Sequence, residues 1–156
     1  MNLFGSVWIM MIGSFIIQYF IMSAIMTNSP SNIRATTGKF YISTIMALLM
    51  GLLEVAMYDY HMGTVSLIYY LSLSFCLVIF VYLYRNQYYI NDKDYLNEMI
   101  EHHSMALLTS EEILQKTKSE RVKRLAENII ATQQKEIEYM AQLSDASVWV
   151  VGSLAL

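Results

Sequence analysis

The chain has 156 residues, of which 56 % are hydrophobic, a larger share than an ordinary soluble domain carries. Its formal net charge of −3 leaves no surplus of basic residues, so we do not expect a nucleic acid as a partner. A single cysteine, Cys76, excludes a disulfide framework and a cysteine-based zinc site within one chain.

The first part of the chain consists of three apolar runs, 3–26, 40–58 and 64–84, and a polar loop at 27–38 separates the first two. Each run is long enough to cross a bilayer, which takes about 20 residues. We expect helices, because a bilayer offers the backbone no other hydrogen-bond partners. Residues 1–84 are therefore predicted to be the three-span transmembrane region of an integral, multi-pass membrane protein.

Charged residues of both signs become dense from Arg85 onward, and two stretches of helical periodicity follow. Asn91 or Asp92 can cap the first helix, and Ser119 can cap the second. The stripes are Leu96, Met99, His103, Ala106 or Leu107, Ser110 and Ile113 or Leu114 on the first helix, and Val122, Leu125, Ala126, Ile129, Gln133, Ile137 and Met140 on the second. Two such helices with a short connection form an antiparallel hairpin, which we predict for residues 85–145.

The expected fold class is all-α, with three transmembrane helices followed by the hairpin. Two helices bury little apolar surface by themselves, so we expect the hairpin to pair with a second copy in a homodimeric four-helix bundle. Residues 146–156 form an apolar tail that is too short to span a bilayer. This tail is either a docked end or a disordered one.

Two adjacent histidines, His102 and His103, lie in the first helix of the hairpin, about one turn after Met99. Imidazole and thioether groups are the ligands that suit copper among the common metals. Adjacent helical residues point about 100° apart, so the two rings can flank one groove but cannot both face a single partner squarely. Glu98 lies four residues before His102 and shares its face of the helix.

The second helix carries Gln133, Glu136 and Met140 on one face, and polar groups within an apolar stripe are costly unless they find partners. Facing the histidines would supply those partners. Asp92 is a further candidate ligand, although a role at the helix N-terminus explains it equally well. The candidate metal-site residues are Met99, His102, His103, Glu136, Met140, Gln133 and Asp92.

The membrane region holds a second pattern of methionines. Five residues of the second span follow spacings of four, four, three and four, and five residues of the first span are spaced similarly. They are Met46, Met50, Glu54, Met57 and His61 in the second span, and Met11, Ser14, Gln18, Met22 and Met26 in the first. This pattern indicates either a path of soft ligands for copper or the use of methionine as a common apolar residue.

The hairpin motifs resemble the membrane-anchored branch of the CopM-like copper-binding family, a ferritin-like helical domain of unknown function. The resemblance rests on Asp92-x-x-Tyr95, on Met99-Ile100-x-His102-His103-x-x-Ala106 and on Gln133-x-x-Glu136-Ile137-x-x-Met140. It implies a ferritin-like four-helix bundle, a copper ion held by histidine and methionine, and three preceding spans. The family usually has proline before the histidine pair, where this chain has Glu101.

The side of the membrane on which the hairpin lies is open. The basic residues near the spans, Arg34, Lys39, Arg85 and Lys93, fall on the hairpin side, and the positive-inside rule then places the hairpin in the cytoplasm. The family resemblance indicates the periplasm or exterior, which we favour.

We expect an integral membrane protein that binds copper, or a related soft transition metal, for metal sequestration or resistance. Catalysis is not expected, because the sequence has no nucleophile–base arrangement, phosphate-binding loop or Glu-x-x-His pair. The alternative is a non-catalytic structural or assembly protein of the membrane. In that case the hairpins oligomerise, His102 is a solvated surface residue, and His103 is a core residue with a satisfied ring nitrogen.

Overall fold

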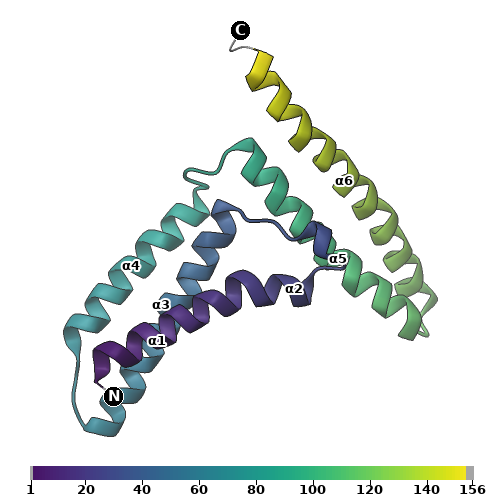
Figure 1. The fold of residues 1–156 in the computed structure, drawn as a ribbon. Coiled ribbons are helices and arrows are strands. Elements are labelled where there is room, and N and C mark those ends of the chain that lie inside the picture. Colours follow the sequence, from purple (N-terminus) through teal and green to yellow (C-terminus); the bar gives the residue numbers. More distant parts are fainter. Residues whose placement is uncertain (1, 154–156) are drawn as a thin grey trace. The chain divides into compact units, whose positions relative to one another are not determined.

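The computed structural model describes the backbone of residues 2–153 and the side chains of residues 2–145. Every regular element in this part of the chain is helical, which confirms the predicted all-α class (Figure 1). The elements are α1 (Leu3–Ile16), a π-helical turn η1 (Ile17–Ile21), α2 (Met22–Met26), a 3-10 turn η2 (Pro30–Asn32), α3 (Thr37–Met62), α4 (Leu67–Arg85), α5 (Asp92–Lys116) and α6 (Glu120–Ser153).

The end of the chain is described only in part. The backbone of residues 146–153 continues α6, so the apolar tail begins as helix. Whether its side chains are docked is a question that falls outside the described residues, as do residues 154–156 altogether.

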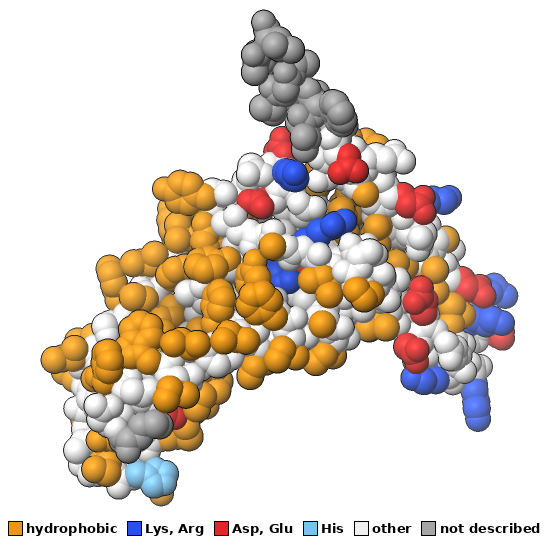
Figure 2. Space-filling model, in the orientation of Figure 1, with side chains coloured by type: hydrophobic (Ala, Val, Ile, Leu, Met, Phe, Trp, Pro, Cys, Tyr) orange, Lys and Arg blue, Asp and Glu red, His pale blue; other side chains and the backbone are white. Residues whose placement is uncertain are grey.

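The described residues form two compact units, and the first contains α1, η1, α3 and α4. Three helical segments, Leu3–Met26, Thr37–Met62 and Leu67–Arg85, are long and apolar enough to cross a membrane, as predicted. On the face drawn in Figure 2, hydrophobic side chains gather over this unit, whereas Lys, Arg, Asp and Glu gather over the hairpin. Cys76 is exposed on α4, and no residue of α4 is buried.

The first unit, residues 1–22 and 37–89, is called the membrane unit below because it holds the apolar helices. Helix α3 is its centre, because both α1 and α4 pack against α3. Gly51 permits the close approach of α1, since an added Cβ would lie only 2.9 Å from Cγ of Met11. Near the end of α3, the Ser6 hydroxyl of α1 donates a hydrogen bond to the Glu54 carboxylate. Small residues at a helix contact and a polar pair across it are the features that join helices in a lipid environment.

The second unit contains the antiparallel hairpin of α5 and α6, whose core includes the buried residues Ile100, Leu107 and Ala126. The Asn91 side chain accepts a hydrogen bond from the Asp94 amide at 2.9 Å, so Asn91, not Asp92, is the N-cap of α5.

The stripe predicted on α6 is buried only in part. Of its residues, Ala126 is buried, but Leu125 is 60 % exposed and Val122 is exposed as well. Tyr139 and Leu143, which were not part of the predicted stripe, are also exposed. Within one chain, Leu125 is therefore not part of the contact between α5 and α6. An apolar face of α6 is left for another surface.

Residues 23–36 cover the end of the predicted first span, 3–26, and most of the predicted polar loop, 27–38. They belong to the hairpin unit and pack on α5. Glu101 of α5 is buried, and its carboxylate accepts hydrogen bonds from the Ser23 hydroxyl at 2.5 Å and from the Arg34 amide at 2.8 Å. One turn later, the buried Ser104 hydroxyl donates a hydrogen bond to the side-chain oxygen of Asn28 at 2.7 Å. It also accepts one from the backbone N–H of Asn28 at 3.1 Å. Glu101 and Ser104 thus fasten this segment to the hairpin.

We expect the substitution Glu101→Ala to lower the stability of the hairpin unit by about 1.5–3 kcal/mol, because it removes a charged acceptor and leaves buried donors unsatisfied. Thermal unfolding of the full chain in detergent, followed by circular dichroism, measures the loss. Glu111→Ala, at an exposed position of the same helix, is the matched control. Equal melting temperatures for the two variants would contradict the assigned role of Glu101.

Candidate metal centre

His103 is held by a backbone contact within its own helix. Its Nδ1 lies 2.7 Å from the carbonyl oxygen of Met99, one turn earlier, and the His103 side chain is 15 % exposed. A carbonyl oxygen only accepts, so Nδ1 must carry a hydrogen. In the neutral ring, Nε2 then has a free lone pair, and the ring orientation is fixed.

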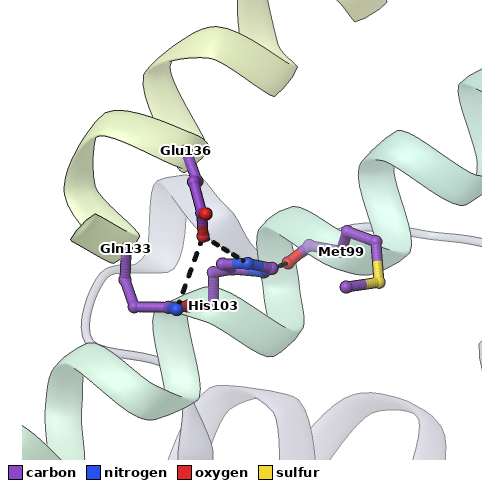
Figure 3. Close-up of polar contacts among 4 residues, drawn as sticks. All are labelled: Met99, His103, Gln133 and Glu136. Atoms are coloured by element: carbon purple, nitrogen blue, oxygen red, sulfur yellow. Dashed lines mark hydrogen bonds and ion pairs between the residues drawn. The ribbon is translucent and has the colours of Figure 1, made fainter. Parts of the chain in front are cut away.

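The other ring nitrogen of His103 faces α6. Nε2 lies 2.9 Å from Oε2 of Glu136, and the Gln133 amide nitrogen donates to the same carboxylate oxygen at 3.4 Å (Figure 3). With a proton on each ring nitrogen, the contact is an ion pair between an imidazolium and a carboxylate. With Nε2 unprotonated, an imidazole lone pair and a carboxylate oxygen are directed at the same place, which is an arrangement that binds a cation. The Glu136 side chain is 48 % exposed, so this place is open on one side.

The structure brings together only some of the predicted site residues. Met99 contributes its carbonyl oxygen, while its sulfur points away from Glu136 (Figure 3). His102 is exposed, and its charge acts on Glu98 of the same helix. Asp92 is exposed at the start of α5, about 16 Å along the helix axis from His103.

Met140 is half-buried about one turn after Glu136. Across the part of the chain with described side chains, no group of three or more His, Cys, Asp and Glu residues is positioned to hold a metal ion. The groove between α5 and α6 thus offers two donors of these kinds, His103 and Glu136, supported by Gln133 and the Met99 carbonyl.

Glu98 is a half-buried carboxyl group beside this site. Burial raises the pKa of Glu98, the His102 charge lowers it, and the Asp94 and Glu101 charges raise it further. One carboxylate oxygen, Oε2, is enclosed and has no hydrogen-bond partner among the described residues. The ionised form of Glu98 is therefore disfavoured in the folded chain.

We expect Glu98→Gln to raise the melting temperature at pH 7. A carboxyl with a raised folded-state pKa destabilises the fold as the pH rises through the unfolded value, about 4.3, and then through the folded value. At about pH 3 the group is protonated in both states, so the two melting temperatures should converge. Thermal unfolding in detergent at both pH values measures this, with the exposed Glu111→Gln as control. A gain of equal size at both pH values would sink the explanation.

Comparison with known proteins finds a family model that matches the hairpin. The model of a domain of unknown function, DUF305, matches residues 86–145, which are α5 and most of α6. The uncharacterized protein L153 of Acanthamoeba polyphaga mimivirus is 36 % identical over 137 residues, covering 88 % of this chain and 90 % of the viral protein. No solved structure matches the chain.

The similarity to the viral protein cannot be confined to the hairpin, since 88 % of the chain is reached only if the apolar helices are included. The alignment therefore extends over apolar helices as well as the hairpin of this chain. The chain belongs to the same family as this viral protein, and its α5–α6 hairpin matches the DUF305 model.

Proposed function

We propose that this chain is a membrane-anchored, non-catalytic protein whose hairpin binds copper, or a related soft transition metal, for metal sequestration or resistance. Within the family we assign it to the CopM-like copper-binding branch. The observation that carries the proposal is the His103 ring, fixed by the Met99 carbonyl at 2.7 Å and directed at Glu136 at 2.9 Å.

The distance between the two donor atoms supports metal binding. Nitrogen and oxygen ligands bind divalent transition metals at about 2.0–2.2 Å. Two ligands at right angles around the metal are then about 3 Å apart, which agrees with the 2.9 Å between His103 Nε2 and Glu136 Oε2. Right angles between nitrogen and oxygen ligands are typical of tetragonal Cu(II) sites. Gln133 would hold Glu136 in place from outside the ligand shell.

A second copy of the hairpin supplies what one copy lacks. Two donors do not complete a copper site, and an apolar face of α6 stays exposed in one chain. We propose a homodimer in which this face is buried in a ferritin-like four-helix bundle. The half-buried Met140 thioether would add a soft ligand, and the three apolar helices would anchor each copy in the bilayer, with the hairpin on the exterior or periplasmic side.

The contact between His103 and Glu136 also fits the structural alternative. If His103 is permanently protonated, its contact with Glu136 is an ion pair that fastens α5 to α6 and binds no metal. Measured copper binding distinguishes the two functions.

We expect the full chain in detergent to bind about one Cu(II) per chain, and His103→Ala to abolish this stoichiometric binding. Gln133→Ala should weaken binding by about 10- to 100-fold, the usual effect of losing a group that orients a ligand. Binding should also weaken in acid, because a ligating imidazole must be neutral. Titration calorimetry and elemental analysis of protein purified without added metal measure these effects.

His61→Ala is a matched control for the copper titration. The ring nitrogen Nδ1 of His61 also contacts a carbonyl one turn earlier, that of Met57 at 2.8 Å, but among the described side chains no carboxylate pairs with its other nitrogen. This variant should bind copper as the wild type does. Wild-type affinity no tighter than about 0.1 mM, equivalent to about 5.5 kcal/mol, would favour the structural alternative.

We expect the full chain in detergent to be dimeric, and Leu125→Asp to make it monomeric without loss of helicity. Leu125 is exposed in one chain, so an aspartate there disturbs the proposed dimer contact and not the hairpin itself. Gln134→Asp is the control, because nine residues, about two and a half turns, place it on the opposite side of α6. Light scattering after gel filtration gives the mass, and a monomeric wild type would exclude the dimer.

A further inference from the structure

A groove of about 640 Å³ lies between α1 and α3 in the membrane unit. Four of the twelve methionines of the chain line it, together with four polar residues that can donate or accept hydrogen bonds. The methionines are Met10, Met22, Met46 and Met50, and the polar residues are Ser6, Ser14, Gln18 and Glu54. No residue of the hairpin contributes to this groove, so it is separate from the site at His103.

The packing of α1 on α3 sets which groups meet in the groove. The hydrogen bond from Ser6 to Glu54 fixes the register of these antiparallel helices. A step of four residues forward on α1 and four back on α3 keeps the same faces in contact and pairs Met10 with Met50. The thioethers of Met10 and Met50 therefore lie one helical turn from Ser6 and Glu54, toward the middle of α1 and α3.

The structure selects different methionines from those that the sequence pattern joined. Met11, included in the predicted stripe of the first span, packs on Gly51, and the neighbouring Met10 lines the groove. Met57, included in the stripe of the second span, does not line the groove. Its 40 % exposed side chain offers a comparison on the same helix.

We propose that this groove binds a soft monovalent cation, Cu(I) or its analogue Ag(I), through Met10, Met50 and Glu54. Thioether sulfur is a soft, uncharged ligand that selects Cu(I) over the hard cations. Glu54 supplies one negative charge, and a single positive charge balances it. A divalent ion would leave a net charge within a membrane helix, where an uncompensated charge is costly.

A lipid chain is the competing occupant of a mainly apolar groove. It would fill the space beside the methionines but would offer the Glu54 carboxylate neither a positive charge nor a hydrogen-bond donor. The Ser6 hydroxyl gives the Glu54 carboxylate a hydrogen bond but no positive charge, so the negative charge still favours a cation over a lipid chain.

The test uses the full chain in detergent with His61, His102, His103 and Cys76 all replaced by alanine, so that neither the histidines nor the exposed thiol can contribute. Ag(I) is the probe, because it resembles Cu(I) in charge and softness. We expect this protein to bind about one Ag(I) per chain, with sulfur neighbours in X-ray absorption spectra. Met10→Leu with Met50→Leu, which conserves side-chain volume, should remove the bound Ag(I) and leave the helical circular dichroism unchanged.

Two further variants complete the test in the same histidine-free protein. Met57→Leu should bind Ag(I) like its parent, and Glu54→Gln, which changes no sulfur, should weaken binding at least tenfold. The proposal is overturned if the histidine-free protein binds no Ag(I), if the Met10 and Met50 double variant keeps it, or if mass spectrometry finds only a retained lipid. Because the histidines are absent, none of these outcomes bears on copper binding by the hairpin.

Discussion

The buried carboxylate of Glu101 is the interaction on which the hairpin unit depends. It joins α5 to residues 23–36 through the Ser23 hydroxyl and the Arg34 amide, while Ile100 and Leu107 fill the core of the same unit. Helix α5 is thus covered from two directions, and each residue advances the helix by about 100°. Because the Glu101 side chain contacts residues 23–36, the rotation of about 200° from residue 101 to residue 103 directs His103 toward α6. The position of the candidate ligand follows from a contact that involves neither a metal nor α6.

The fold was predictable where the signal is local, whereas only part of the candidate site was predictable. Three apolar runs and two amphipathic helices are visible in composition and periodicity, and the structure has helices at all of them. The packing of residues 23–36 was not predictable, because its hydrogen bonds join residues 67 to 78 positions apart and its sequence has no periodicity. In the sequence, Glu101 stands out only because it replaces the proline that is usual at this position in the family that the hairpin motifs resemble.

The histidine pair illustrates how helical geometry divides a sequence motif. Spacing alone placed His102, His103 and Met99 in one site, and it also placed Glu136 and Gln133 opposite them. The structure joins His103, Glu136 and Gln133, while His102 is exposed and the Met99 sulfur points elsewhere. Which of two adjacent histidines turns inward depends on the full packing of α5, including residues far away in the sequence. The same limit applies to Met10 and Met11, of which only the former lines the membrane groove.

The single, exposed cysteine makes the membrane unit accessible to spectroscopy without any engineering. Cys76 is the middle residue of α4, with nine helical residues on either side, or about 14 Å to each end. If α4 crosses a bilayer, a nitroxide attached to this thiol would lie near the bilayer centre, where water-soluble relaxation agents do not penetrate. The native chain therefore allows a spin label to measure the depth of α4 in a bilayer without any substitution. A thiol-reactive label at any other position first requires the replacement of Cys76.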